Sequence, residues 1–254
     1  MRFPPPLPEQ SAKPHCMQVI YEDNHLCVVS KPAGLATMGA LPGISTALEL
    51  AKKDIARRYN KPGAVYLGVV SRLDSAVSGV LVFARTSKAA ARLSVQFRDQ
   101  RAKKTYVAIT SRPPQKQADQ LECWMKRNDQ RHITVPAGPQ EEGAQKCSLD
   151  YQVLGEGSGQ WLLQITPHTG RKHQIRAQLK HIGTPILGDH KYDSGYRFSD
   201  GIALHSLSLQ LQHPVLQELF TFSSGPPASW PAWAQLLLQQ HCPATPVRRQ
   251  PLQD

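Results

Sequence analysis

One aspartate stands where a protein scaffold commonly presents a catalytic group. Residues 67–86 read LGVVSRLDSAVSGVLVFART, in which Asp74 follows an apolar, strand-like stretch. A short loop of small residues then leads into a second apolar run at 80–84. Loops held between buried strands often carry catalytic side chains. The structural alternative is that Asp74 only caps a turn.

Strand patterns on both sides of this loop indicate the scaffold. The expected strands are 18–20, 26–30, 80–84, 105–110, 147–153, 161–166, 203–211 and 219–223. Asp23 and Asn24 supply turn chemistry for a hairpin between the first two strands. The glycine-rich segment 155–159 is expected to form a turn, and 111–120 a polar loop.

Helical spacing appears at four places between the strands. Thr46 and Glu49 form a capping-box pattern before an amphipathic helix, whose basic outer face is either solvated or in contact with RNA. The other expected helices are 87–99, 171–181 and 232–240. Strands outnumber helices without a regular alternation, which predicts an α+β fold with a mixed or largely antiparallel sheet.

The net charge of the chain indicates which classes of partner it can bind. The 254 residues suit one large domain or one domain of two lobes, and the net charge is +11 with a pI near 9.6. Such an excess favours nucleic acid as the partner, with an acidic membrane surface second. A solvated and merely basic protein is the alternative.

Cysteine usage and the ends of the chain bear on its location. The five cysteines are an odd number without a CxxC pair, which argues against a disulfide framework and a zinc site. No apolar run approaches the ~18 residues of a membrane helix. We therefore expect a cytoplasmic protein with a disordered, proline-rich lead-in at 1–16, one catalytic domain at 17–241 and a tail at 242–254.

Four stretches resemble a known family when they are taken together. The segment around Asp74 is similar to HRLDxxTSGLLLxAKT, a motif of RluA-type pseudouridine synthases. The others are 21–34, like YEDxxLLVxNKPAG; 97–108, like FxxRxVxKxYxAxV; and 169–189, like TGRTHQIRxHLxxIGxPIxGDxxYG. Weaker matches occur at 204–205 and 213–214. The motifs follow in the family's order and at its spacing, from about residue 18 to about residue 224.

The resemblance implies a cofactor-free isomerisation of uridine and a pseudouridine synthase fold with a central basic cleft. Asp74 would be the nucleophile that attacks the ribose anomeric carbon, after which the freed uracil rotates and rejoins through C5. Arg176 would be the cation paired with Asp74, and Tyr106 would stack on the target base. From the residues alone, Arg176 could equally be a surface arginine and Tyr106 a core residue.

The resemblance also implies residues that contact RNA. Arg72 would help to displace the flipped nucleotide, although a structural salt bridge is the alternative. Arg171 and Lys172 would add positive charge near a helix start whose backbone N–H groups can bind phosphate. His173 has no acidic partner at metal-ligand spacing, so RNA contact or capping is favoured over a metal site.

The sequence departs from the family pattern in two places. Ser71 replaces the usual histidine, and the loop reads SAVSG with Ser75 and Val77 at unusual positions. The residues before the first motif are too few for an S4-type RNA-binding domain, so we expect the catalytic domain to recognise its RNA itself.

The hypothesis is therefore a monomeric pseudouridine synthase acting on ribosomal or transfer RNA without a metal. An idle RNA-binding protein of the same fold is the main alternative. A serine or metal-dependent hydrolase lacks a supporting motif, since no G-x-S-x-G elbow is present.

Overall fold

A single mixed sheet organises the part of the chain that the structure describes. The computed structural model describes residues 17–242 and 247–250. Within these ranges, 12 strands follow the order β1-β2-β4-β10-β5-β9-β8-β6-β7, with β11 on β10, β12 on β11 and β3 on β4. All pairings are antiparallel except that of β10 with β4. The α+β prediction with a mixed, mostly antiparallel sheet is confirmed.

The strands are β1 (Gln18–Glu22), β2 (Leu26–Lys31), β3 (Gly68–Val69), β4 (Ser78–Ala84), β5 (Lys103–Thr110), β6 (Ala118–Asn128), β7 (Ile133–Pro136), β8 (Gln145–Gly157), β9 (Gln160–Pro167), β10 (Leu204–Gln212), β11 (Leu219–Ser223) and β12 (Val247–Gln250). The helices are α1 (Ala47–Arg58), α2 (Ser87–Arg98), α3 (Gln174–His181) and α4 (Ala232–His241), with a short 3-10 helix η1 at His190–Tyr192.

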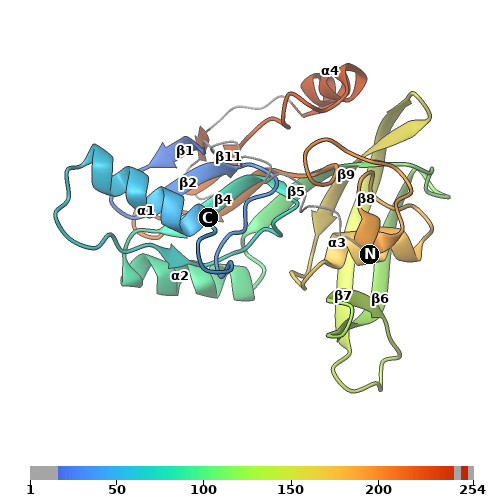
Figure 1. Ribbon diagram of the computed structural model, residues 1–254, viewed down its shortest axis with the longest axis horizontal. Coiled ribbons are helices and arrows are strands. Elements are labelled where there is room, and N and C mark those ends of the chain that lie inside the picture. The colour runs from blue at the N-terminus through green and yellow to red at the C-terminus, as the bar shows by residue number, and fades with distance from the viewer. Residues whose placement is uncertain (1–16, 243–246, 251–254) are drawn as a thin grey trace, which may run out of the picture.

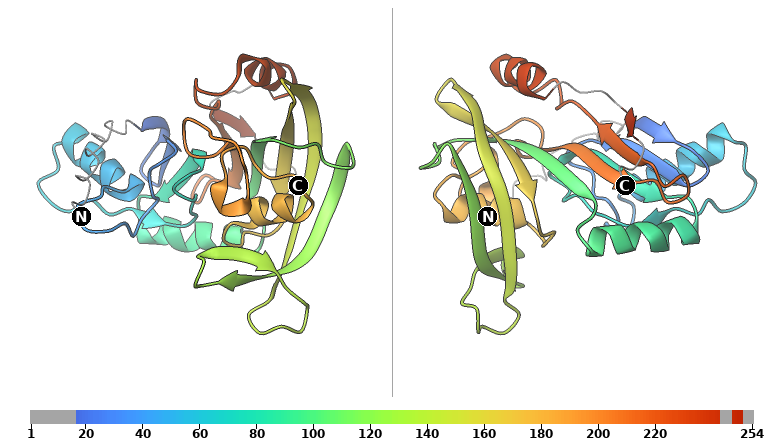
Figure 2. Two further views of the ribbon diagram at one scale, coloured as in Figure 1. Left: turned by 45° about the vertical axis from the view of Figure 1, so that its right-hand side comes forward. Right: turned by 180° about the vertical axis from the view of Figure 1, so that it is seen from behind.

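The sheet runs through two lobes. Figure 1 shows β1, β2 and β4 with α1 and α2 in one lobe, and β6–β9 with α3 in the other. The central strands β10 and β5 join the lobes, and both views of Figure 2 show the same division. The middle of the sheet is thus where segments from both lobes can meet.

Strands β2 and β4 are buried on both faces. Cys27, Val29, Leu81 and Phe83 pack in the same core as α1, whereas the alternate side chains along both strands pack with Leu93 of α2. Period-two alternation places successive side chains on opposite faces. This burial explains the continuous apolar run that ends β4, because a strand with helices on both faces has no solvated side.

The predicted helix starts are largely confirmed. The Thr46 hydroxyl accepts a hydrogen bond from the Glu49 backbone N–H at 3.3 Å, and the Glu49 carboxylate accepts one from the Thr46 backbone at 2.9 Å. At the start of α2, the Thr86 hydroxyl likewise accepts a hydrogen bond from a backbone N–H of the first turn. However, α3 begins at Gln174 rather than 171, because His173 adopts a left-handed conformation with φ +55°.

Several predicted boundaries were wrong for packing reasons. Residues 118–120 belong to β6 rather than to a polar loop. Gly155 and Gly157 lie within β8, and the turn is at 158–159. A Cβ on Gly155 would lie 2.7 Å from Leu237 of α4, so close helix packing explains a glycine there. Part of the predicted tail also forms β12, which pairs with β11. The predicted disordered lead-in at 1–16 lies outside the described residues.

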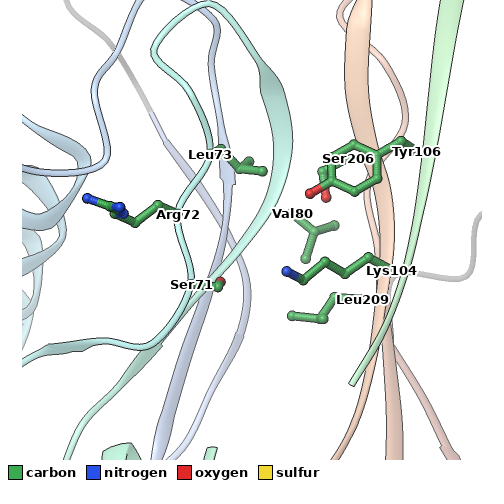
Figure 3. A pocket seen from close by; sticks show the side chains of 8 residues that line it. All are labelled: Ser71, Arg72, Leu73, Val80, Lys104, Tyr106, Ser206 and Leu209. Atoms are coloured by element: carbon green, nitrogen blue, oxygen red, sulfur yellow. The ribbon is translucent and has the colours of Figure 1, made fainter. Parts of the chain in front are cut away.

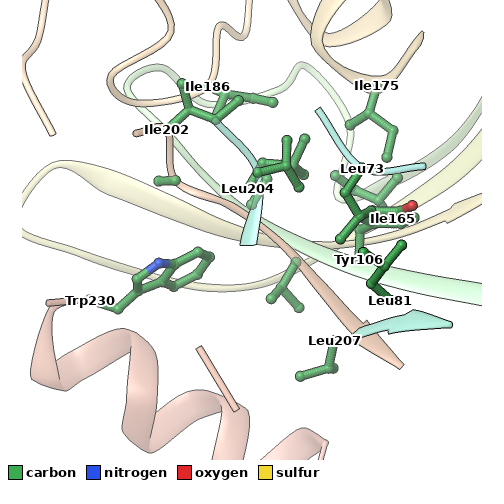
Figure 4. Packing of buried hydrophobic residues seen from close by; sticks show 14 of the residues in the cluster. Leu73, Leu81, Tyr106, Ile165, Ile175, Ile186, Ile202, Leu204, Leu207 and Trp230 are labelled. Atoms are coloured by element: carbon green, nitrogen blue, oxygen red, sulfur yellow. The ribbon is translucent and has the colours of Figure 1, made fainter. Parts of the chain in front are cut away.

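The core of the central sheet reaches the loop that carries Asp74. Figure 4 shows Leu73 among Tyr106, Ile165 and Ile175. These residues come from the loop before β4, from β5 and β9, and from α3. The packing of one side chain, Leu73, therefore ties the loop to the central strand β5 and to the lobe that contains β9 and α3.

Candidate active site

The segment that follows β2 anchors the loop that carries Asp74 on both sides of that residue. The Thr37 hydroxyl donates to the Leu73 carbonyl at 2.8 Å and accepts from the Leu73 N–H at 3.1 Å. On the other side, the Ser75 carbonyl accepts from the Gly34 N–H at 2.8 Å. The carboxylate between these anchors is 27% exposed. Asp74 is therefore held by its neighbours' backbone while its own side chain stays open to a substrate.

A buried lysine strengthens the same anchoring. The Lys31 ammonium donates to the carbonyls of Pro32, Leu35 and Ser75, at 2.8, 2.7 and 3.3 Å. Burial lowers the pKa of Lys31 to about 7, partly opposed by the charge of Asp74. Three N–H donors thus hold the turn that leads from β2 to the catalytic loop.

Arg176 links two carboxylates. Its Nη1 donates to Oδ2 of Asp74 at 3.1 Å, and its Nε and Nη2 donate to the two oxygens of Asp189 at 2.6 and 2.8 Å. Burial alone would lower the pKa of Arg176, but the hydrogen bonds and charges of Asp189 and Asp74 raise it. The guanidinium therefore stays charged beside Asp74, and the two-pronged contact with Asp189 sets its orientation.

Asp189 was not among the predicted site residues. It is 1% exposed and lies just before η1, 13 residues after Arg176. A carboxylate at the end of the fourth motif, GTPILGD, was the signal that could have identified it. Its pairing with Arg176 depends on a loop returning to α3, which spacing along the chain does not reveal.

His173 also faces Asp74. Its Nε2 lies 3.6 Å from Oδ2 of Asp74, and its Nδ1 lies 3.0 Å from the Tyr192 hydroxyl. That hydroxyl accepts from the Thr134 N–H at 2.8 Å, so its own proton is free to be donated to Nδ1. Burial lowers the pKa of His173 to about 4. A neutral imidazole with its N–H on Nε2, directed toward Asp74, fits these contacts.

Tyr106 lies in a small cavity beside the loop. Its side chain is buried, and Figure 3 shows its ring and Ser206 facing Leu73 across the cavity. Burial raises the pKa of Tyr106 to about 12, and the charge of Asp74 adds to this rise. The phenol is therefore protonated at neutral pH, close enough to Asp74 to sense its charge.

The other predicted RNA contacts lie at the surface. Arg171 and Lys172 are exposed. The backbone N–H groups near the start of α3 were expected to be available to a phosphate. One of them is already used within the protein, because the Arg171 N–H donates to the Gln174 side chain at 3.0 Å. Arg72 is exposed and points away from Tyr106 in Figure 3, on the side of the loop opposite the buried Leu73. In the described ranges, no carboxylate forms an ion pair with Arg72, so the salt-bridge alternative has no support there.

No candidate metal centre is found in residues 17–242 and 247–250. No group of three or more His, Cys, Asp or Glu side chains there could hold an ion. Nor is any helix in that part of the chain both long and apolar enough to cross a membrane.

Known proteins have sequences similar to that of this chain. A family model described as RNA pseudouridylate synthase matches residues 25–181. The dual-specificity RNA pseudouridine synthase RluA of Haemophilus influenzae is 32% identical over 223 residues, covering 82% of this chain and 92% of that protein. The ribosomal large subunit pseudouridine synthase C of Vibrio parahaemolyticus is 30% identical over 207 residues, covering 79% of this chain and 62% of that protein.

Solved structures show the same fold. Human RNA pseudouridylate synthase domain containing 4 aligns with a TM-score of 0.69 at 24% identity, covering 88% of this chain and 92% of that one. The predicted pseudouridine synthase fold is thus confirmed. With the family model matching more than half of the chain and a relative matched over nearly its full length, this protein belongs to the RNA pseudouridylate synthase family and is an isomerase that acts on RNA.

Proposed function

We propose that this enzyme converts uridine to pseudouridine in structured ribosomal or transfer RNA, with Asp74 as the nucleophile. The observation that carries the proposal is the pairing of a partly exposed Asp74 with a buried Arg176 at 3.1 Å. A partly exposed carboxylate paired with a fixed cation, beside an aromatic ring in a cavity, suits covalent catalysis on a base. The idle RNA-binding alternative would not need this pair.

The reaction needs no external reagent. Asp74 attacks C1′ of the target uridine, and the C1′–N1 bond breaks with its electron pair going to uracil. The uracil rotates so that C5 faces C1′, the C5–C1′ bond forms, and the bond from C1′ to Asp74 breaks. The proton on C5 is then lost and N1 gains one. Arg176 balances the carboxylate's charge at the start and the end of the cycle.

Tyr106 supports the base during this rotation. Stacking of a base on an aromatic ring contributes roughly 1–3 kcal/mol and tolerates rotation of the base in its plane. A phenol whose pKa is raised to about 12 keeps its proton at neutral pH and so can donate a hydrogen bond. Tyr106 is thus suited to hydrogen bonding with a uracil oxygen while the base is detached.

The remaining predicted residues bind RNA. Arg171 and Lys172 are exposed cations close to His173 and Arg176, and Arg72 extends from the catalytic loop. One relative is named for the large ribosomal subunit and another as dual-specificity, which supports a choice among structured RNAs. The protein acts as a cytoplasmic monomer in this proposal, in keeping with the free cysteines among the described residues and with the basic charge of the chain.

The test is a pseudouridine map of cells that lack this gene, rescued with the wild type or with Asp74→Ala. We expect a site that returns only with the wild type, which would identify the RNA and the uridine together. Asp74→Ala should retain most of its RNA affinity. Equal rescue by both versions would reject Asp74 as the nucleophile, and a map without any dependent site would favour the idle RNA-binding protein.

A further inference from the structure

A lysine shares the cavity of Tyr106. Lys104 precedes Tyr106 by two residues on β5, so both side chains lie on the same face of that strand. Figure 3 shows both of them directed toward the segment that leads to Asp74, whereas Arg72 points away. The residues that line this cavity are Ser71, Arg72, Leu73, Val80, Lys104, Tyr106, Ser206 and Leu209. Lys104 is therefore the cation that the cavity presents beside the aromatic ring.

This lysine differs from the other buried cations of the site. Arg176 has two carboxylate partners, and Lys31 has three carbonyl acceptors. Across the described part of the chain, no carboxylate or carbonyl accepts a hydrogen bond from the side-chain ammonium of Lys104. Its Nζ lies 4.9 Å from the centre of the Phe97 ring, and burial lowers its pKa.

A half-buried ammonium without an acceptor costs free energy unless a ligand supplies one. An anion is the acceptor that would remove this cost most fully, because it accepts the hydrogen bond and also balances the charge, which a neutral carbonyl does not. The anionic group of RNA is its phosphodiester. Two residues of a strand span about 6.6 Å, so Nζ is displaced along β5 from the tyrosine ring by a distance that a backbone phosphate next to a stacked base can cover.

We propose that Lys104 binds a phosphodiester adjacent to the target uridine and so holds the nucleotide between Tyr106 and Asp74. This inference rests on the proposed function, because it takes the base to be stacked on Tyr106. In this proposal the ring of Tyr106 stacks on the base, and the ammonium of Lys104 binds the RNA backbone. The contact is electrostatic and carries no base sequence.

The adjacent lysine provides a matched control. Lys103 is on the opposite face of β5 and is exposed. Lys103→Met and Lys104→Met remove the same charge one residue apart, and only the second removes it from the cavity. Lys104→Arg keeps the charge, and circular dichroism melts of all three variants establish that each is folded.

The experiment measures binding rather than turnover. All variants carry Asp74→Asn, so that the RNA is not consumed, and the probe is a transcript with the uridine identified by the pseudouridine map. A neutral methylphosphonate replaces the phosphates on either side of that uridine, one at a time. Lys104→Met should weaken binding of the normal RNA by about tenfold, whereas Lys103→Met should leave it nearly unchanged.

The inference is decided by whether the losses of binding caused by the protein substitution and by the RNA substitution are additive. With the methylphosphonate at one flanking position, the Lys104→Met protein and its Lys104 parent should bind equally, because the two changes remove the same contact. Additive losses at both positions would overturn the assignment, as would normal binding by Lys104→Met. Turnover by the Asp74→Asn protein would reject the nucleophile instead, and the binding comparison would still decide the role of Lys104.

Discussion

At the scale of single residues, the site is a chain of charges that alternate in sign. Asp74 and Asp189 flank Arg176, and the three are joined by hydrogen bonds of 2.6 to 3.1 Å. Asp74, Tyr106 and Arg176 could be proposed from sequence because each stands inside a motif of recognisable spacing. Asp189 could not be placed against Arg176, since its contact depends on how the loop after α3 folds back.

Asp189→Asn tests this chain of charges. The amide offers one acceptor where the carboxylate offered two, so the buried guanidinium loses part of its compensation. We expect the free energy of unfolding to fall by about 3 kcal/mol and turnover to fall at least tenfold, as measured by urea unfolding and by single-turnover kinetics. Asp193→Asn is the control, because among the described residues that exposed carboxylate forms an ion pair with Lys180 alone, at 2.7 Å, and its loss should leave the unfolding midpoint in place.

At the scale of elements, a buried histidine joins three segments behind the site. His205 of β10 lies 2.8 Å from the Ser78 hydroxyl at the start of β4 through Nδ1, and its Nε2 lies 2.8 Å from the Ser224 carbonyl after β11. Donation from Nε2 to a carbonyl leaves Nδ1 to accept the hydroxyl proton, which requires a neutral ring. Next to it, Gly79 has φ +115°, and a Cβ there would overlap the backbone of Ser206.

The neutral state of His205 predicts a pH dependence of stability. Burial lowers its pKa to about 4, below the value of about 6.5 in an unfolded chain. The unfolded state therefore binds more protons between these values, so the stabilisation is complete above pH 6.5 and is lost as the pH falls toward 4. This residue should account for about 3 kcal/mol of that loss.

His205→Gln should flatten the curve of unfolding free energy against pH between 4 and 6.5, as measured by urea denaturation. His181→Gln changes an exposed histidine and should keep the wild-type slope. If His205→Gln kept the wild-type slope, groups other than His205 would be responsible for the loss of stability at low pH. The sequence placed this histidine on a strand, but only the parallel pairing of β4 with β10 brings it to Ser78.

At the scale of the whole molecule, the net charge of +11 predicts how binding responds to salt. Neutralising RNA phosphates releases counterions, so log affinity should fall linearly with log salt concentration. We expect a loss of at least tenfold between 50 and 200 mM salt in filter binding, with the same slope for Asp74→Ala, whose charge change is local. An affinity that stays flat over this range would contradict an electrostatic RNA surface.

The sequence predicted the lobe with α1 and α2 better than the other lobe. Strands β2 and β4 are short, continuous apolar runs next to clear helix caps. Strands β6 and β7 were missed, because β6 alternates between exposed and half-buried side chains along most of its length and carries a weak apolar period. The glycines of β8 led to a wrong prediction of a turn, because their small size allows α4 to pack closely against the strand.

The central position of β10 in the sheet also sets the order in which activity can arise during synthesis. Asp74 and Arg176 are 102 residues apart, and β10, which lies between β4 and β5, is made after both. A nascent chain that has passed Arg176 but not Gln212 holds the catalytic groups without β10, one of the two central strands that join the lobes. Such long-range closure slows folding, so we expect activity to arise only after nearly the whole domain has left the ribosome.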